Sequence, residues 1–188
     1  MLNANPDIRE LTGTDLEEVV AENPHQRFEL IEGVLYEMPP TGIEHGNREF
    51  RVAYVLEKYN EKHQWGTILT GEVGFYTRDN KKTVRAADVA FISYSRMAAD
   101  ETVRSYGEIA PELIVEIVSP GDRAGEIETK VYEWLDFGVS IVWIVYPQSQ
   151  RIHVFTDKRQ PEIYSKDDIL TGGDVLSGLE IAINDIFK

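Results

Sequence analysis

A strand, a helix and a second strand follow one another in the C-terminal half of the chain, and this succession constrains the fold most. Residues Glu112–Val118 are dense in Leu, Ile and Val, and Ser119-Pro120-Gly121 ends them. A helical pattern runs from about Ala124 to Phe137, closed by Gly138, before a second apolar strand at Ser140–Tyr146. This spacing predicts a right-handed βαβ crossover whose parallel strands are buried inside a sheet.

The N-terminal half predicts a hairpin followed by a long helix. Two strands, Arg27–Ile31 and Val34–Met38, are expected on either side of a Glu32-Gly33 turn. The longest helical pattern spans Ile43–Gln64, and we expect it to stop at Gly66.

Shorter elements complete the pattern. A capping box at Thr14 and Glu17 predicts a short helix that runs to about Glu22. The segment 96–109 is expected to be a surface loop with a helical turn, and Ile183–Phe187 a closing turn of helix. The remaining predicted strands are Thr67–Thr70, Glu72–Thr77, Ala87–Ser93, Arg151–Thr156, Glu162–Tyr164 and Val175–Ile181. Together these elements predict an α/β fold, with a mixed central sheet flanked by helices and with antiparallel edge strands.

Composition narrows the class of protein. The chain has 188 residues, of which 42% are hydrophobic, which suffices for one domain over residues 1–188 with its own core. The absence of cysteine excludes disulfides, thiolate catalysis, zinc–cysteine sites and iron–sulfur clusters. No apolar run is long enough to cross a bilayer, and residues 1–13 lack the basic and apolar regions of a signal peptide. We therefore expect a cytoplasmic protein with no membrane partner.

Two acidic residues interrupt apolar strands. Asp88 lies in Ala-Ala-Asp-Val-Ala-Phe-Ile, and Glu116 lies in Leu-Ile-Val-Glu-Ile-Val. A carboxylate in a buried strand is costly unless it is paired or binds a metal. Asp88 has the alternative of an edge strand facing solvent, or of a strand that starts only at Val89. Glu116 has the alternative of a buried ion pair with Arg or Lys.

Three further polar residues lie beside apolar positions. Lys130 borders the inward stripe of the helix after the Glu116 strand, although its ammonium could also reach past that stripe to water. Glu29 alternates with apolar neighbours in the first hairpin strand, where a solvent-facing position is the alternative. His45 leads the long helix on its apolar face, where a core or cap role is the alternative to binding.

Asp88, Glu116 and Lys130 together match the needs of metal-assisted phosphodiester cleavage. Carboxylates from neighbouring strands would hold Mg²⁺ or Mn²⁺, since these hard ions prefer oxygen ligands. The backbone carbonyl of Ile117 is a further candidate ligand on the same strand. A Lys ammonium would offset charge that develops on the phosphate and could position the attacking water.

The motifs around these residues resemble the Uma-type restriction endonuclease family of the PD-(D/E)XK nuclease superfamily. The resemblance runs from about Arg27 to the C-terminus. It rests on Phe28–Gly33, Glu44-His45, Arg85–Phe91, Pro111–Pro120, and Lys130 with Tyr132 and Gly138. It implies a restriction endonuclease-like fold and a metal-dependent endonuclease that cleaves DNA, with Asp88, Glu116 and Lys130 at its centre. It also implies a homodimer, since two sites would address two strands.

Two departures from the superfamily motif stand out. Ala87 replaces the motif proline, which shapes backbone and does no chemistry. Val118 stands where the motif has lysine, and the resemblance implies that the lysine has moved to the following helix as Lys130. Glu29 would then be an additional metal-site carboxylate, and His45 a residue of unknown role near the site.

The net charge of −14 is unusual for a protein that binds nucleic acid. The basic residues from Arg78 to Arg85 form a small positive island that could hold a phosphate backbone, or they form an ordinary solvated turn. Two other functions therefore remain open: a nuclease-like domain that has lost activity and serves as a binding module, and a metal-dependent phosphoesterase that acts on small nucleotides.

Overall fold

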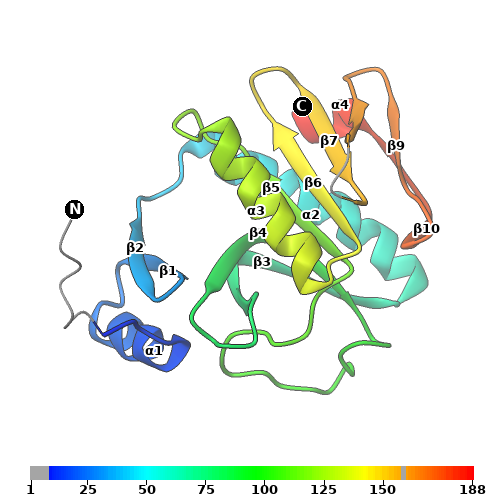
Figure 1. Cartoon of the computed structure of the whole chain (residues 1–188). Coiled ribbons are helices and arrows are strands. Elements are labelled where there is room, and N and C mark those ends of the chain that lie inside the picture. Colours follow the sequence, from blue (N-terminus) through cyan, green and yellow to red (C-terminus); the bar gives the residue numbers. More distant parts are fainter. Residues whose placement is uncertain (1–8, 158–159) are drawn as a thin grey trace.

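The computed structural model describes residues 9–157 and 160–188 and shows a central sheet between helices. The segment 1–8, which carries much of the signal-peptide argument, lies outside the described residues. The long helix α2 (Ile43–His63) covers one face of the sheet, and α3 (Ala124–Phe137) lies against the other (Figure 1). Within the described residues, no helix is long and apolar enough to span a membrane. The α/β fold class predicted from the sequence is confirmed.

The cap of the first helix lies two residues earlier in the chain than expected. Helix α1 (Gly13–Glu22) follows Thr12, whose backbone N–H and hydroxyl both donate to the Asp15 carboxylate. The capping box predicted at Thr14 and Glu17 is therefore wrong, because Thr12 and Asp15 present the same spacing nearer to the true start. Leu16 is buried on the inner face of this helix.

The N-terminal hairpin has the predicted bounds. Strands β1 (Arg27–Ile31) and β2 (Val34–Met38) pair antiparallel, and Ile31 lies opposite Val34 across the turn. Glu32 and Gly33 both have positive φ, as the tight turn of a two-residue hairpin requires.

The segment after α2 differs from the prediction. The helix ends at His63, because Gln64 takes the left-handed conformation and Gly66 already begins β3 (Gly66–Tyr76). The two strands expected here are one long strand. Its register shifts between Thr70 and Val73, where Gly71 and Glu72 have positive φ and form an irregularity in the ladder.

The βαβ crossover is present. Strand β4 (Val84–Ser93) pairs antiparallel with β5 (Leu113–Ile117), which is followed by α3 and by β6 (Ile141–Tyr146) parallel to β5. Residues of β5 alternate between two cores: Leu113, Val115 and Ile117 pack toward α2, whereas Ile114 packs toward α3. Glu116, which alternates with these residues, therefore faces α3.

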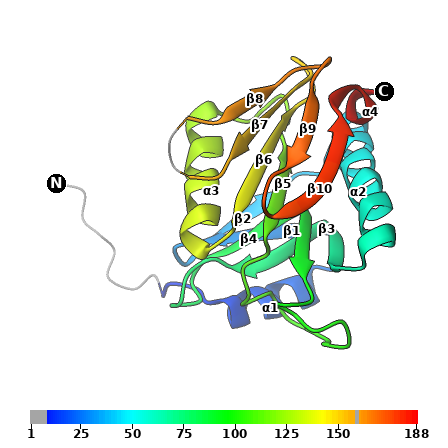
Figure 2. The ribbon, with the colours of Figure 1, turned by 90° about the vertical axis from the view of Figure 1, so that its right-hand side faces the viewer.

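Antiparallel strands close the far edge of the sheet (Figure 2). Strands β7 (Arg151–Phe155) and β8 (Glu162–Tyr164) lie where the sequence predicted them. Strand β9 (Ile169–Gly172) was missed, and it pairs with β10 (Leu176–Ala182) in a separate ribbon before the short helix α4 (Ile183–Phe187).

Strand β4 organises the site because two strands share one of its sides. Strand β3 pairs along the whole length of β4, from Gly66 opposite Ser93 to Tyr76 opposite Val84. On the other side, β1 reaches only Val84, whereas β5 begins opposite Val89. Residues 85–88 therefore lie in a gap between β1 and β5, where their backbone groups have no strand partner on that side.

Candidate active site

Side chains fill the gap that β1 and β5 leave beside β4. The backbone N–H of Ala86 donates to Glu29 Oε1 at 3.0 Å. The carbonyl of the same residue accepts a hydrogen bond from Lys130 Nζ at 2.9 Å. A buried backbone group without a partner is costly, so the split in the sheet favours polar side chains at this place.

Asp88 is buried, with 7% of its surface exposed, so the solvent-facing alternative is wrong. Its Oδ2 accepts a hydrogen bond of 2.6 Å from the backbone N–H of Ile117 on β5. Its Oδ1 lies 3.2 Å from His45 Nε2 on α2. Asp88 thus joins three elements at one point: β4, β5 and the start of α2.

Glu116 faces α3 and contacts two of its side chains. Lys130 Nζ donates to Oε2 at 2.9 Å, and Trp134 Nε1 donates to Oε1 at 2.8 Å. Burial raises the pKa of Glu116; the Lys130 ammonium opposes that rise and the Asp88 carboxylate adds to it, which places the pKa at about 7. The ion pair weighed as an alternative for Glu116 is therefore present and largely buried. Glu116 also interacts with the charges of Asp88 and Glu29, and we call these three carboxylates the acidic cluster.

The Lys130 ammonium lies among carboxylates and does not extend past the helix to water. Besides Glu116, it lies 3.4 Å from Glu29 Oε1, and 23% of its side chain is exposed. Burial lowers the pKa of Lys130, but the charges of Glu116, Glu29 and Asp88 outweigh burial and raise it above its usual value. Lys130 therefore remains a cation at neutral pH.

Glu29 is buried, with 4% of its surface exposed, and it belongs to an ion-pair network that the sequence did not reveal. Arg85 Nη1 donates to Glu29 Oε2 at 3.0 Å, and Arg85 Nε donates to Glu133 Oε2 on α3. Burial raises the pKa of Glu29, but Lys130 and Arg85 lower it below the usual value, so this carboxylate stays ionised. Glu133 and Trp134 were missed as site residues, and Arg85 was assigned only to the positive island. Its position within the apolar strand β4 is the signal that could have indicated a buried partner.

His45 is buried at the start of α2 and faces Asp88. Its Nδ1 lies 3.1 Å from the Ser119 hydroxyl, at the end of β5. Burial lowers the pKa of His45, and the contact with the Asp88 carboxylate outweighs burial and raises it. Within residues 9–157 and 160–188, Nε2 makes no hydrogen bond, and its contact with Asp88 Oδ1 at 3.2 Å is that of an ion pair.

The donor set is compatible with an open magnesium site. Among the described residues, no group of three or more His, Asp and Glu side chains is arranged as a metal-binding cluster. Mg²⁺ needs fewer, because it is usually held by one or two carboxylates plus water and substrate oxygens. Asp88 and Glu116 supply carboxylate oxygens, the donors that this ion prefers, and they lie close enough for the Asp88 charge to raise the pKa of Glu116.

The positive island, one of two alternatives for residues Arg78 to Arg85, does not form. Lys81 pairs with Glu108, Lys82 with Glu10, and Arg85 with Glu29 and Glu133. Arg78 lies 4.0 Å from carboxylates of Glu32 and Glu133. Acidic partners therefore offset these cations, and the turn offers little free positive charge for a phosphate backbone.

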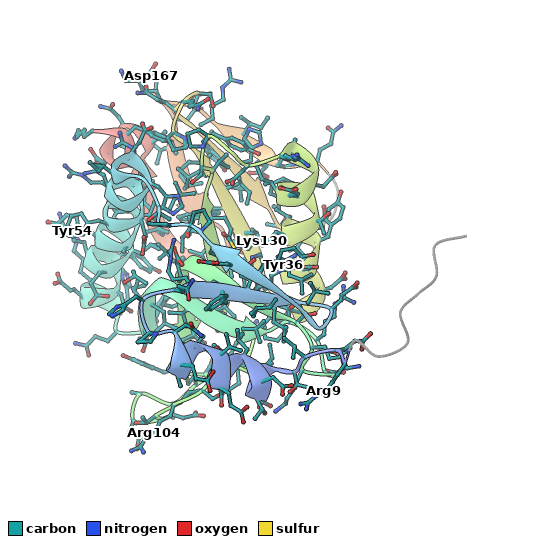
Figure 3. All side chains as sticks on the ribbon, turned by 90° about the vertical axis from the view of Figure 1, so that its left-hand side faces the viewer. Arg9, Tyr36, Tyr54, Arg104, Lys130 and Asp167 are labelled. Atoms are coloured by element: carbon teal, nitrogen blue, oxygen red, sulfur yellow. The ribbon has the colours of Figure 1, made fainter. Side chains whose placement is uncertain are left out.

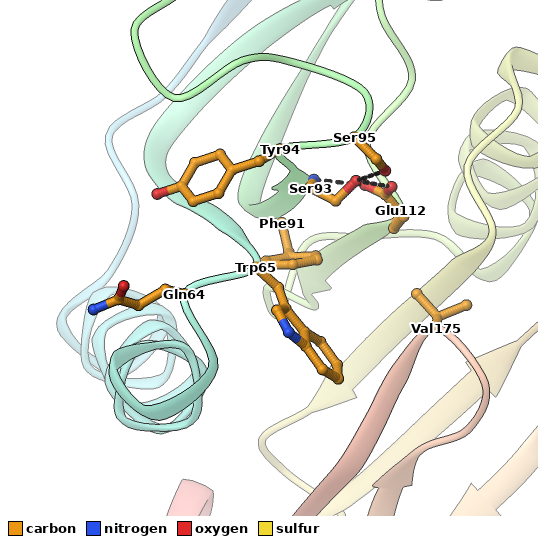
Figure 4. Close-up of a pocket in the computed structure, with 8 residues that line it drawn as sticks. All are labelled: Gln64, Trp65, Phe91, Ser93, Tyr94, Ser95, Glu112 and Val175. Carbon is orange, nitrogen blue, oxygen red and sulfur yellow. Dashed lines mark hydrogen bonds between the residues drawn. The ribbon is translucent and has the colours of Figure 1, made fainter.

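A pocket at the far end of β4 contains none of the predicted site residues. Trp65, Phe91, Ser93, Glu112 and other residues line it, and the Glu112 carboxylate accepts from the backbone and hydroxyl of Ser93 (Figure 4). Glu112 also pairs with Arg96 at 3.0 Å. The polar groups of the pocket hold the strand ends together. Because none of the predicted site residues lines it, the pocket is separate from the acidic cluster.

Comparisons with known proteins agree with this architecture. The chain is similar to a structure from Anabaena variabilis ATCC 29413 titled as a putative nuclease belonging to DUF820, with a TM-score of 0.78 and 19% identity. The match covers 94% of this chain and 97% of the other. No curated protein matches the chain. The family model described as Uma2, putative restriction endonuclease, matches residues 14–184. The chain therefore belongs to the Uma2 family of putative restriction endonucleases.

Proposed function

We propose that the protein is a divalent-metal-dependent endonuclease that hydrolyses phosphodiester bonds of DNA. One observation carries the proposal: Asp88, Glu116 and Lys130, from two strands and the following helix, lie around the gap beside β4. The Asp88 carboxylate is close enough to raise the pKa of both Glu116 and Lys130. Glu29 and His45 contact the same group. Family membership supports the nuclease class, and the acidic cluster with its single amine supports the metal-dependent chemistry.

Asp88 and Glu116 would hold Mg²⁺ or Mn²⁺, with the Ile117 carbonyl and Glu29 as further candidate ligands. When bound, the ion would polarise the phosphate and lower the pKa of a coordinated water. The N–H of Ile117 donates to Asp88 Oδ2 and leaves Oδ1 on the side of His45. This hydrogen bond fixes the carboxylate before substrate arrives, which is the preorganisation that catalysis requires.

Lys130 acts through its charge. Its ammonium contacts the Ala86 carbonyl, Glu116 and Glu29, and its raised pKa keeps it protonated, so it is not a general base. A fixed cation beside the scissile phosphate would offset the negative charge that develops as the bond to the leaving oxygen breaks. Glu29, held by Arg85, would keep the ammonium in place.

Plasmid cleavage tests the proposal. We expect the wild-type protein to nick or linearise supercoiled DNA with Mg²⁺ or Mn²⁺ and to lose this activity in EDTA. Lys130→Ala should reduce the rate by a factor of 100 or more, on the order of the loss of one charge-stabilising donor. Lys166→Ala, which removes an exposed lysine far along the chain, is the matched control and should cleave normally. Cleavage that survives Lys130→Ala unchanged would overturn the role given to Lys130.

A second function has one observation in its favour. Carboxylates offset the basic residues between Arg78 and Arg85, so a continuous track for duplex DNA is absent from this turn. A metal-dependent phosphoesterase that acts on small nucleotides needs no such track. Hydrolysis of a dinucleotide without any cleavage of plasmid would support this second function.

A further inference from the structure

An exposed apolar strip lies beside the acidic cluster, on the same face of the hairpin as Glu29. The register places Tyr36 directly opposite Glu29, with Val34 opposite Ile31 and Met38 opposite Arg27. Residues opposite one another in an antiparallel pair project from the same face, with Cβ atoms about 5 Å apart. Val34, Tyr36 and Met38 are exposed, whereas Glu29 is buried.

The hairpin does not need this strip for its own stability. Its opposite face packs into the core through Leu30, with Leu35 and Phe28 beside it, against Leu16 of α1. Within the described residues, Tyr36 makes no hydrogen bond, ion pair or ring contact, and 48% of its surface is exposed. Figure 3 looks onto this hairpin and labels both Tyr36 and Lys130 near its centre.

Charge alone gives this protein little affinity for nucleic acid. The net charge is −14, and three cations of β1, β4 and α3 are paired: Arg85 with Glu29 and Glu133, Lys130 with Glu116, and Arg27 with Glu72. A substrate held weakly through its phosphates must be held by other contacts. Stacking of bases on aromatic side chains is such a contact, and it requires no net positive charge.

We propose that Tyr36 stacks on an unpaired base of the nucleic-acid strand whose phosphate enters the acidic cluster, with Val34 and Met38 extending the apolar contact. The inference rests on the proposed function for the identity of the substrate. Bases inside a duplex offer only their edges, so the ring of Tyr36 can stack only on a base outside the helix. The preferred substrate is therefore single-stranded DNA or a strand with unstacked bases.

Binding without cleavage tests the inference. A fluorescein-labelled single-stranded DNA oligonucleotide is titrated with the full chain in EDTA, and fluorescence anisotropy is compared with that of the same sequence as a duplex. We expect tighter binding to the single strand. Tyr36→Ala should weaken that binding about tenfold, within the range measured for stacked aromatic residues, and Tyr36→Trp should retain it.

Tyr54 on α2 provides a matched control, because it has the same exposed fraction of 48% and lies away from the cluster (Figure 3). Tyr54→Ala should bind as the wild type does. Equal affinity of Tyr36→Ala and wild type, or tighter binding of the duplex, overturns the inference. So does a wild-type dimer, seen by sedimentation, that Tyr36→Ala dissociates, since the strip would then be covered by a second copy.

This assay separates the inference from the proposed function. Metal-dependent cleavage by the wild type, together with unchanged binding by Tyr36→Ala, would contradict the stacking role alone. Single-strand binding through Tyr36 without cleavage by any divalent ion would support the stacking role and contradict the nuclease.

Discussion

At the scale of single residues, the charged side chains of the site shift one another's pKa values. Glu116, whose side chain is 12% exposed, lies between Lys130 and Trp134, with the Asp88 charge nearby. Glu29, by contrast, is kept ionised by Lys130 and Arg85. Two carboxylates that contact the same ammonium thus have pKa values shifted in opposite directions, which is a common feature of catalytic sites.

The pKa of Glu116 predicts how metal binding depends on pH. Because burial raises this pKa to about 7, the carboxyl is protonated below that pH and must lose its proton to bind an ion. The apparent affinity for Mn²⁺ should therefore rise up to tenfold per pH unit below about 7 and level off above it. Calorimetric titration at several pH values measures this. Affinity that is flat between pH 5 and 7 contradicts the assignment of Glu116 as a ligand.

Substitution of Arg85 should reduce the free energy of unfolding. Arg85→Ala would leave Glu29 and Glu133 without their buried partner, and breaking a buried ion pair typically costs about 3–5 kcal/mol. Urea denaturation should show a loss in the free energy of unfolding of this order. The control Arg123→Ala removes an exposed pair with Glu126 and should change stability by less than about 1 kcal/mol. Comparable effects of the two substitutions would contradict the structural role of Arg85.

At the scale of elements, helix α3 must end where it does for β6 to return beside β5. Gly138 caps it with φ of 106°, a conformation that costs a side chain about 1–2 kcal/mol. Gly138→Ala should therefore destabilise the protein by that amount in thermal or urea unfolding. Gly125→Ala, in the same helix with open space around its Cβ, should instead stabilise by up to about 1 kcal/mol. Equal changes in both variants would show that the cap is unimportant.

The elements whose bounds were predicted well are those with clear turn or cap residues at their ends. The bounds expected from the sequence are those of the hairpin strands, α3, β8 and α4. Strand β9 was missed because Ile169–Gly172 is short and alternates over too few residues to be recognised. Two strands were expected in place of β3 because Gly71 resembles a turn residue in the sequence. In the structure Gly71 lies at an irregularity within a single strand, whose pairing with β4 continues on both sides.

The acidic residues of the site could be predicted, whereas their partners could not. Asp88 and Glu116 stand out because a charge inside an apolar strand is rare. Arg85 and Glu133 come together only through the gap between β1 and β5, which depends on registers that local sequence does not encode. The catalytic and metal-binding roles of Asp88, Glu116, Lys130, Glu29 and His45 stay predictions.

At the scale of the whole molecule, net charge predicts how nucleic-acid binding responds to salt. Because nearby cations are largely paired, we expect release of counterions from about one to three phosphates, hence a slope near −1 to −2 in a plot of log affinity against log salt. Anisotropy with a single-stranded oligonucleotide between 50 and 200 mM salt measures the slope. A slope steeper than about −5 would contradict this expectation, because it would require many more phosphate contacts than the few unpaired cations can make.

The proposed function depends on binding of a divalent ion at the gap beside β4, through Asp88 and its neighbours. Isothermal titration of Mn²⁺ into the wild type and into Asp88→Ala tests it most directly, with Asp122→Ala as a control for an exposed carboxylate in the same region. We expect a saturable site in the wild type and the control, and loss of that site in Asp88→Ala. Equal binding by Asp88→Ala, or no binding by the wild type, would show that Asp88 does not hold a divalent ion at this gap.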